Sequence, residues 1–366
     1  MTKWLRAACA AAAVAMLAAG CSSGGGGTSS TSAMDAVSFG PPEKTTVNVG
    51  VVPALDSAGF FVAMDEGLFA KEGLTIHYTP ETSSDTAISA QLKGGLDVSG
   101  GNYVSYIRAE MDNPADNLEI ISEGSIMTTG AQMIYTSPES GIHSLSDLKG
   151  RTLTVNAPDD LDYLLAASVL QENGINPKTV DFPAKPVSFP DMSKNLADGT
   201  VKAAILPEPF ASTAMQQGGA IPLADLNQGA TQQFPVEGYV VTKQWAAQNP
   251  NTLRRFLAAL SEGQEVADTD RDAVAKAFED IKGGPSYGQV TQETAGVMAL
   301  SEYPVGIDES RLQRVSDVMF QFGLEPGRKQ AYNISSMLMP TSAFNFMPFE
   351  PGTTSSSESG TTSSSA

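Results

Sequence analysis

Short apolar runs and segments of helical period alternate along residues 45–101. Strands are predicted at 45–52, 73–78 and 96–101, and helices are predicted at 60–68 and 85–93. The pair Gly94 and Gly95 is typical of the end of a helix, where a residue without a side chain can take the left-handed conformation. Strands that alternate with helices at this spacing indicate a parallel α/β sheet.

The same order of elements recurs in the second part of the chain. Strands are predicted at 151–157, 179–184 and 201–206, and helices at 161–174 and 192–199. Matching positions lie 105, 101 and 104 residues apart, for the pairs Val47 and Thr152, Gly73 and Gly174, and Gly95 and Gly199. This agreement predicts two similar α/β lobes.

The remaining folded part of the chain is predicted to be helical. Two stripes of apolar residues at helical spacing are typical of core faces: Leu253, Phe256, Leu257 and Leu260, and then Leu312, Val315, Met319 and Phe322. A lobe, a second lobe and helices that return to the first predict two crossings between the lobes, at 132–137 and 238–243. We expect lobe I to comprise residues 45–134 and 243–348, and lobe II to comprise residues 135–242.

Residues 1–20 have the pattern of a secretion signal. Two basic residues precede an apolar run that is too short to span a bilayer comfortably. The segment LAAGC, which ends at Cys21, resembles the lipobox of bacterial lipoproteins, in which the cysteine is lipidated and becomes the mature N-terminus. The alternative is an ordinary secretion signal with an incidental cysteine. We expect lipidation of Cys21, a flexible tether at 21–44 and a disordered Ser/Thr-rich tail at 349–366.

The charge of the chain is strongly negative. It has 41 Asp and Glu against 22 Lys and Arg, a formal net charge of -19, which is a poor composition for binding nucleic acid. Two cysteines and two histidines are too few for a disulfide framework or a multi-cysteine zinc site, and leave little room for histidine-based catalysis. We therefore expect no nucleic-acid partner, no metal and no cofactor.

Four segments carry a resemblance to a known protein family. They read VNVGVVPALDSAGFFVAMDEGLFAKEGLTIHY at 47–78, AQLKGGLDVSGG at 90–101, HSLSDLKGRTLTV at 143–155 and NLADGTVKAAILPEPF at 195–210. The chain resembles the solute-binding proteins of ABC importers in the nitrate/sulfonate/taurine group, which is similar to the binding proteins for thiamine-pyrimidine precursors. The resemblance implies an α/β, two-lobed type II periplasmic-binding fold, in which each lobe is a mostly parallel sheet with flanking helices and two hinge crossings join the lobes. It also implies delivery of the solute to a membrane permease.

In open α/β sheets the ligand lies beyond the carboxyl ends of the strands, so the loops that follow the predicted strands form the candidate site. From these loops we select as ligand-binding residues Asp56, Ser83, Ser84, Asn102, Tyr103, Asn156, Asp159, Tyr163 and Glu208. Several of the loops open helices, whose free N–H groups can bind an anion, but a Ser or Asp there can equally be a plain N-cap. We assign no catalytic residue.

The candidate loops are rich in acids and aromatic residues and poor in cations, which suits an amine or a flat nitrogen heterocycle better than a bare oxyanion. We expect an extracytoplasmic, lipid-anchored monomer at the cell membrane that captures a small polar sulfur- or nitrogen-containing organic compound. An aminosulfonate such as taurine or a pyrimidine would fit, with an ABC permease as the protein partner. Two alternatives are an enzyme of the same fold, such as a pyrimidine-precursor synthase, and an extracellular ligand sensor. The mature chain lacks the cysteine cluster of such synthases and has only two histidines, so we do not expect an enzyme.

Overall fold

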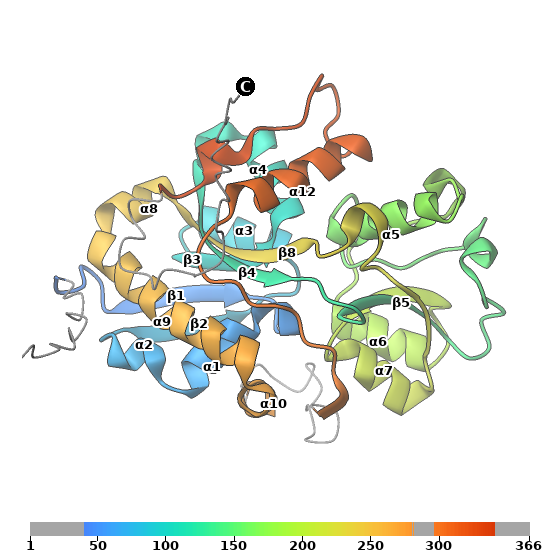
Figure 1. Ribbon diagram of the computed structural model, residues 1–366, viewed down its shortest axis with the longest axis horizontal. Helices are drawn as coiled ribbons and strands as arrows, with labels where there is room; N and C mark the ends of the chain where they lie inside the picture. Colours follow the sequence, from blue (N-terminus) through green and yellow to red (C-terminus); the bar gives the residue numbers. More distant parts are fainter. Residues whose placement is uncertain (1–39, 280, 282–295, 341–366) are drawn as a thin grey trace, which may run out of the picture. The chain divides into compact units, whose positions relative to one another are not determined.

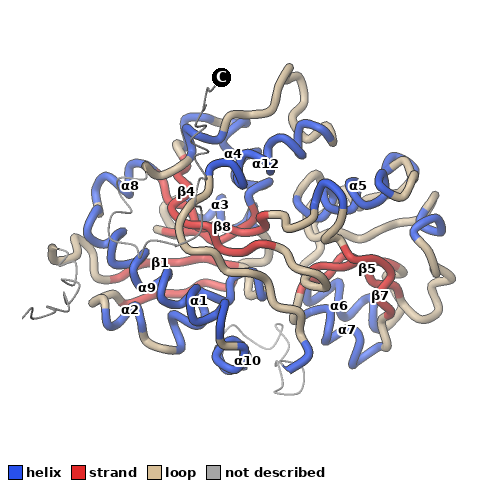
Figure 2. Tube along the Cα trace, in the orientation of Figure 1, coloured by secondary structure: helices blue, strands red, loops and turns tan. Residues whose placement is uncertain are grey.

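The fold contains two β-sheets with helices packed against them. The computed structural model describes residues 40–279, 281 and 296–340 of the 366-residue chain. The predicted signal segment, Cys21 and the tail at 349–366 therefore lie outside the described residues. Figure 1 shows β1 to β4 and β8 in one sheet region and β5 in the other, and Figure 2 shows helices on both sides of the strands.

The first sheet has five strands in the order β2-β1-β3-β8-β4. β1 runs parallel to β2 and β3, whereas β8 is antiparallel to both β3 and β4. The strands are β1 (Thr46–Val51), β2 (Thr75–Pro80), β3 (Val98–Asn102), β4 (Leu118–Ile126) and β8 (Pro235–Thr242). The parallel half keeps the predicted alternation, with α1 (Ala58–Asp65) and α2 (Leu68–Lys71) after β1 and α3 (Ser84–Leu92) after β2.

Helices cover both faces of this first sheet. Val240 of β8 and Ile120 of β4 belong to one hydrophobic cluster, whereas their neighbours Val241 and Ile121 belong to another. The first cluster includes residues of α4 (Tyr103–Asp112) and α12 (Glu309–Gln321), and the second includes residues of α1, α9 (Pro250–Thr269) and α10 (Arg271–Glu279). Figure 1 shows where these helices lie beside the strands. All of β8 except Thr242 is buried, as is expected of a strand that is covered on both faces.

The second sheet has the strand order β6-β5-β7, and β5 is antiparallel to both neighbours. The strands are β5 (Gln132–Thr136), β6 (Ala203–Pro207) and β7 (Ile221–Asp225). Ile134 and Ile205 pack with α5 (Leu161–Glu172), and Tyr135 and Leu206 pack with α6 (Phe189–Ala197) and α7 (Phe210–Gly218). Helices therefore cover both faces of this sheet as well (Figure 1).

Two of the strands predicted in the second half are reduced to single parallel bridges. Thr154 forms one parallel β-bridge with Ala204 of β6, and Thr152 forms one with Asp181. In the first sheet β1 likewise has the parallel neighbours β2 and β3. The predicted repeat is therefore present in the order in which the segments lie side by side. Pro183 and Pro186 follow Asp181, and because proline has no N–H group to donate, a longer ladder does not form there.

Strands β4, β5 and β8 lie where the chain passes between the sheets, and they add antiparallel pairs to the parallel order. β8 occupies the last part of the range that we expected in lobe II, yet it pairs within the first sheet. β5 begins at Gln132, ahead of the expected start of lobe II. The residue pattern of a mostly apolar strand such as β8 does not indicate which sheet the strand joins. The predicted lobe boundaries stay a prediction.

Residues 40–44, which we expected in the tether, contact the first turn of α9. The Glu43 carboxylate accepts hydrogen bonds from the N–H groups of Asn251 and Thr252 at 3.0 and 2.9 Å. The carbonyl oxygen of Gly40 accepts a hydrogen bond from the Arg255 guanidinium at 3.1 Å. The start of the described chain is thus fixed to α9, because these groups satisfy N–H donors that the helix itself leaves unpaired.

Both predicted helical stripes fall on helices and face the core. The buried members are Leu253, Phe256, Leu257 and Leu260 on α9, and Leu312, Val315 and Met319 on α12, while Phe322 is partly buried. The remaining short elements are η1 (Leu55–Ser57), η2 (Pro114–Asp116), η3 (Leu145–Leu148), η4 (Pro177–Thr179), η5 (Gly229–Thr231), α8 (Lys243–Gln248) and η6 (Ile334–Met337). Within the ranges given above, none of the helices is long and apolar enough to cross a membrane.

Candidate functional site

A small cavity lies beyond the carboxyl ends of β1 and β3, where residues from both sheet regions meet. Its volume is about 40 Å³, which leaves room for a few water molecules. The first sheet region contributes the polar residues Asp56, Ser84, Asn102 and Glu237. The second contributes Gln132, Asn156, Asp160 and Asp162. The apolar part of the lining consists of Val52, Ala54, Leu161, Phe189 and Val236.

Asp160, at the start of α5, connects the two sheet regions through hydrogen bonds. One carboxylate oxygen accepts from Nδ2 of Asn102 at 3.0 Å, and the other accepts from Oγ of Ser105 at 2.9 Å. Nδ2 of Asn102 also donates to Oγ of Ser84 at 3.0 Å. These contacts bring the end of β3 and the first turns of α3 and α4 onto the start of α5.

Arg108 on α4 makes a second connection between the regions just outside the cavity. Its guanidinium donates to the carbonyl oxygens of Pro158 at 3.1 Å and Asp159 at 2.6 Å. It also pairs with the Asp85 carboxylate at 3.3 Å. The Arg108 guanidinium is therefore already paired with groups outside the cavity. The described residues that line the cavity include no lysine, arginine or histidine.

Asp162 organises the part of the cavity that belongs to the second sheet. Its carboxylate accepts from Nε2 of Gln132 at 2.9 Å and from the backbone N–H of Asn156 at 2.8 Å. Nδ2 of Asn156 in turn donates to the carbonyl oxygens of Val187 at 2.9 Å and Thr82 at 3.2 Å. The side chains of Asp162 and Asn156 thus fix the loop that follows the Thr152–Thr154 segment.

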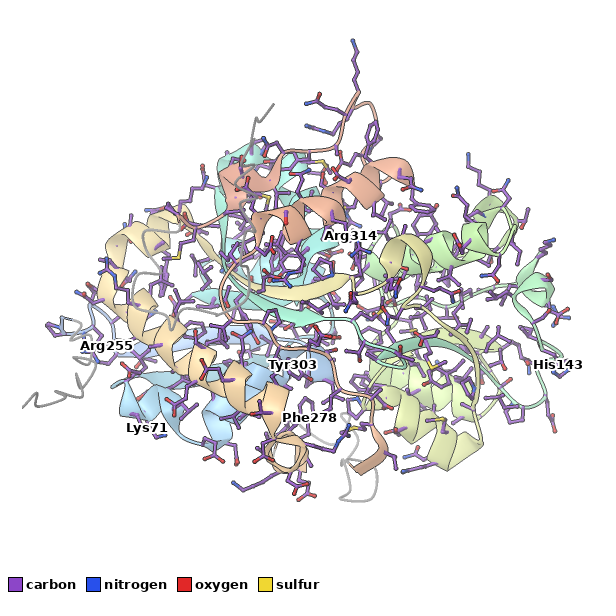
Figure 3. The ribbon with its side chains drawn as sticks, in the orientation of Figure 1. Lys71, His143, Arg255, Phe278, Tyr303 and Arg314 are labelled. Atoms are coloured by element: carbon purple, nitrogen blue, oxygen red, sulfur yellow. The ribbon has the colours of Figure 1, made fainter. Side chains whose placement is uncertain are left out.

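Asp56 on η1 and Glu237 on β8 lie on the side of the first sheet. Oδ1 of Asp56 accepts from the hydroxyls of Ser125 and Ser301 at 3.3 and 3.4 Å, and the Ser57 hydroxyl donates to Oε1 of Glu237. The Tyr303 hydroxyl, near the middle of Figure 3, donates to the carbonyl oxygen beside Asp56, that of Leu55, at 2.8 Å. η1 is thereby held in place from two sides.

Burial raises the pKa values of all four cavity carboxyls. Desolvation is the largest cause in each case, and it raises the pKa of Asp56 and Asp160 to about 6 and that of Asp162 to about 7. Burial and the charge of Asp56 raise the pKa of Glu237 well above its usual value. Hydrogen bonds from the neighbouring hydroxyl, amide and N–H groups lower these pKa values only in part. Burial therefore opposes the charged form of each of these four carboxyls.

The structure brings part of the predicted set of site residues to the cavity. Those that line it are Asp56, Ser84, Asn102 and Asn156. Each of them lies at or after the carboxyl end of a strand or of the bridged Thr152–Thr154 segment, as the rule for open α/β sheets predicts. Their role in binding stays a proposal.

Three other selected residues have structural partners away from the cavity. The Ser83 hydroxyl caps α3 by accepting from the Thr86 N–H at 3.3 Å. The Tyr103 ring is buried beside Gly238, where a Cβ atom would lie 2.5 Å from it. The Glu208 carboxylate accepts from the N–H and hydroxyl of Ser212 at 3.0 and 2.8 Å, which caps the first turn of α7.

The last two selected residues also lie outside the lining of the cavity. Asp159 has a left-handed backbone, with a φ of 52°, and presents its carbonyl oxygen to Arg108. The Tyr163 ring packs edge-on against Phe182, with ring centroids 5.0 Å apart. Neither residue lines the cavity.

Four polar lining residues are absent from the predicted set: Gln132, Asp160, Asp162 and Glu237. Glu237 and Gln132 lie in strands that are otherwise apolar, and a polar residue in a buried strand is the signal that could have indicated them. Asp160 and Asp162 stand beside Asp159 in a run of acids, where the sequence does not show which side chain points inward.

Two larger hollows lie elsewhere on the first sheet region. One, of about 440 Å³, borders Asp97 at the amino end of β3, and the Asp97 carboxylate is already occupied by Lys44 and Trp245. The other, of about 400 Å³, is an outer groove between α3 and α4. The small cavity is preferred because it lies at the carboxyl ends of the strands and combines polar groups from both sheets.

One sequence family accounts for most of the described chain. Residues 40–281 match the sequence profile of the NMT1-like family. The chain belongs to this family. The NMT1-like chain is 25% identical over 287 residues to the nitrate/nitrite binding protein of Nostoc sp., covering 69% of this chain and 64% of that protein. It is 27% identical over 238 residues to the bicarbonate transport ATP-binding protein of Synechocystis sp., covering 60% and 35%. It thus spans less than two thirds of the length of these relatives.

Solved structures share the fold of the NMT1-like chain. The alkanesulfonate-binding protein of Xanthomonas axonopodis bound to MOPS aligns with a TM-score of 0.65 at 16% identity, covering 81% of this chain and 99% of that one. The periplasmic nitrate-binding protein of Synechocystis aligns with a TM-score of 0.66 at 16% identity, covering 79% and 84%. The predicted type II periplasmic-binding fold and the resemblance to the nitrate/sulfonate group are confirmed.

Proposed function

We propose that this chain is the solute-binding component of an ABC importer and that it captures a small polar organic compound containing nitrogen. The observation that carries the proposal is the cavity between the two sheet regions, at the carboxyl ends of β1 and β3. In folds of this kind a ligand that contacts both regions can stabilise one arrangement of them and so shift the population towards it. A permease can then distinguish the loaded protein from the empty one.

The names of the relatives support the transport part of the proposal. One is a nitrate/nitrite binding protein, and two are ATP-binding proteins for bicarbonate transport and nitrate import. An ABC permease with its ATPase is the corresponding partner here. We place the chain on the extracytoplasmic face of the cell membrane as a monomer, held by a lipid on Cys21 and a flexible tether.

The lining of the cavity supports a nitrogen-bearing ligand rather than a bare oxyanion. It supplies carboxylates and amide groups, while the nearest arginine, Arg108, is used by backbone oxygens and Asp85. An oxyanion such as nitrate would meet like charges in this cavity and pay for their repulsion. An aminosulfonate or an aminopyrimidine could instead donate N–H groups to the carboxylates.

A thermal-shift screen of the full chain in a mild detergent tests the proposal. The panel comprises taurine, alkanesulfonates, nitrate, bicarbonate, aminopyrimidines and amino acids. A ligand that binds only the folded state stabilises it, by roughly 2–4 kcal/mol in the free energy of unfolding at saturation. We therefore expect at least one nitrogen compound to raise the Tm by several degrees. No shift with any compound contradicts the importer function, and chemical conversion of a compound favours an enzyme instead.

The lipid anchor has a separate test. We expect the wild-type chain to partition with membranes after expression in a bacterium, and the Cys21→Ala variant to be released into the soluble fraction. Cys9→Ala, a change of the same kind within the signal segment, is the matched control and leaves partitioning unchanged. A Cys21→Ala variant that is processed and still partitions with membranes contradicts lipidation.

A further inference from the structure

The cavity presents hydrogen-bond acceptors that the protein itself does not use. Asp56 and Glu237 each accept hydrogen bonds at one carboxylate oxygen, and no described residue donates to the other. Oε1 of Gln132 is buried and has no hydrogen-bond partner among the described residues. A buried acceptor without a donor costs roughly 1–3 kcal/mol, so Oε1 of Gln132 marks a position to which a ligand should bring a donor, and Asp56 and Glu237 line the same cavity.

The orientation of the Gln132 amide follows from its neighbours. Its Nε2 donates to Asp162 at 2.9 Å, and Asp162 already accepts the Asn156 N–H, so Asp162 is an acceptor on both sides. The nitrogen of the amide is therefore directed at Asp162 and leaves the oxygen for another group. The side chain is only 4% exposed, so water reaches that oxygen poorly.

The charge of the lining favours a positively charged donor over a neutral one. Asp56, Asp160, Asp162 and Glu237 surround the cavity, and the described residues that line it include no cation. Burial, together with the charges of Asp160 and Asp56, raises the pKa of Asp162 to about 7. Buried anions without a counter-charge are unfavourable, and a cation placed among them offsets their desolvation cost and reduces their mutual repulsion.

The volume of the cavity limits the size of the charged group. About 40 Å³ holds a few water molecules, which is the space of a group of three or four heavy atoms. An ammonium, amidinium or guanidinium group has that size and carries three or more N–H donors. Such donors can reach acceptors that lie on different elements, namely η1, β5 and β8.

We infer that the solute is a small organic cation, whose ammonium, amidinium or guanidinium group donates to Asp56, Glu237 and the amide oxygen of Gln132. This inference rests on the proposed function and narrows its ligand class. Asp160 and Asp162 complete the negative surroundings and hold the two sheet regions around the bound group.

Two sets of molecules with the same planar shape and different charge test the inference. They are acetamidinium, acetamide and acetate, and guanidinium, urea and nitrate, each titrated calorimetrically into the full chain in detergent. We expect each cation to bind at least about tenfold more tightly than its neutral counterpart, because the hydrogen bonds it makes are charge-assisted. The anions should bind more weakly still.

Other outcomes separate the two proposals. Equal or tighter binding of a neutral or anionic member overturns the cation inference and leaves the solute-binding function standing. Binding of magnesium, calcium or zinc ions alone overturns it as well. Absence of binding by both sets and by the wider thermal-shift panel overturns the solute-binding function and the cation inference together.

Charge-removing variants locate the site. Glu237→Gln and Asp56→Asn should each weaken binding of the preferred cation at least about tenfold and change binding of neutral molecules little. Asp317→Asn makes the same type of change at an exposed position on α12 and should leave affinity unchanged. If one cavity variant fails to fold, as judged by circular dichroism, the other carries the test. Unchanged affinity in a folded cavity variant overturns the inference.

Discussion

Asp160 and Asp162 are held by hydrogen bonds, but no cation among the described lining residues balances their carboxylates. Each carboxylate oxygen accepts one hydrogen bond, which favours the charged form. Burial favours the neutral form and has the larger effect, so the pKa values rise to about 6 for Asp160 and about 7 for Asp162. Both groups therefore change their protonation close to neutral pH.

We expect the ligand-free protein to lose stability as the pH rises from about 5 to about 8. Asp160 and Asp162 bind protons more tightly in the folded protein than in the unfolded chain, so protonation stabilises the fold. This contribution is present at low pH and disappears as the pH passes their folded pKa values. The loss should amount to roughly 4 kcal/mol, measured as a fall in Tm by calorimetry across the pH range.

The variant Asp162→Asn should reduce this dependence on pH. The asparagine cannot ionise, and the Gln132 amide can rotate to accept its N–H group, so the fold is retained. The exposed change Asp317→Asn is the control and should leave the slope as in the wild type. A Tm that is flat or increases between about pH 5 and pH 8 would contradict the raised pKa values.

Individual residues show how far the sequence predicts the site. The strand-end rule predicts Asp56, Ser84, Asn102 and Asn156, because chain direction alone brings them to the cavity. It does not predict the direction of a side chain. The Tyr103 ring turns away into the space beside Gly238, and that contact depends on the pairing of β3 with β8, which no local pattern reveals.

At the scale of elements, α1 and α9 pack closely against each other. A Cβ atom at Gly263 of α9 would lie 2.4 Å from the carbonyl oxygen of Gly59 and 2.6 Å from Cβ of Ala63. A Cβ atom at Gly59 would lie 2.5 Å from the Gln264 side chain. The two helices thus approach backbone to backbone, and this approach positions η1, which precedes α1 and carries Asp56.

Gly263→Ala should destabilise the protein by roughly 2–3 kcal/mol, measured by urea denaturation. The new methyl group meets backbone atoms of α1, which cannot move without shifting the helix. In an unhindered helix the same change normally stabilises by roughly 0.5–1 kcal/mol, so the sign of the effect is diagnostic. Gly296→Ala, where no atom lies within 4 Å of the added Cβ, is the control. Equal stability of Gly263→Ala and the wild type would contradict the close packing.

Elements were predicted well where local residues decide the conformation. Gly94 and Gly174 both have left-handed backbones, with φ values of 80° and 69°, and follow the ends of α3 and α5 as the sequence predicts. The strand predicted at 179–184 is shortened to one bridge because the register of its neighbours and two prolines limit pairing. Local pattern predicts that a segment is extended, whereas the pairing of a strand is decided by the rest of the sheet.

At the scale of the whole described region, one hydrophobic cluster joins the two sheets. Ile120 and Val240 of the first sheet belong to the same cluster as Ile134 and Ile205 of the second, together with Leu164 of α5. Buried contacts that continue from one sheet to the other couple their stabilities.

We therefore expect a single cooperative thermal transition, with equal calorimetric and van't Hoff enthalpies. Leu164→Ala, at a fully buried position, should lower the stability of that whole transition by roughly 2–5 kcal/mol. The exposed change Leu92→Ala on α3 is the control, because that side chain is 40% exposed. Two separate transitions, with only one affected by Leu164→Ala, would contradict the coupling.

Arg108 provides a polar connection between the same regions. Arg108→Gln removes hydrogen bonds to the carbonyl oxygens of Pro158 and Asp159. Amide hydrogens at the start of α5 should then exchange about tenfold faster, because a charge-assisted hydrogen bond of roughly 1.5 kcal/mol is lost. Amides of α9 should be unchanged, and Arg254→Gln on α9 is the matched control. Unaltered exchange at the start of α5 would show that the hydrophobic cluster alone holds the regions together.

The position of β8 in the first sheet also bears on biosynthesis. β8 lies between β3 and β4, and its partner Ser99 precedes Val240 by 141 residues. The first sheet can be completed only after the ribosome has added Thr242, so its pairing edge on β3 stays open through most of translation. For a chain exported as proposed, such a delay keeps the nascent polypeptide in a form that can still be threaded through a membrane.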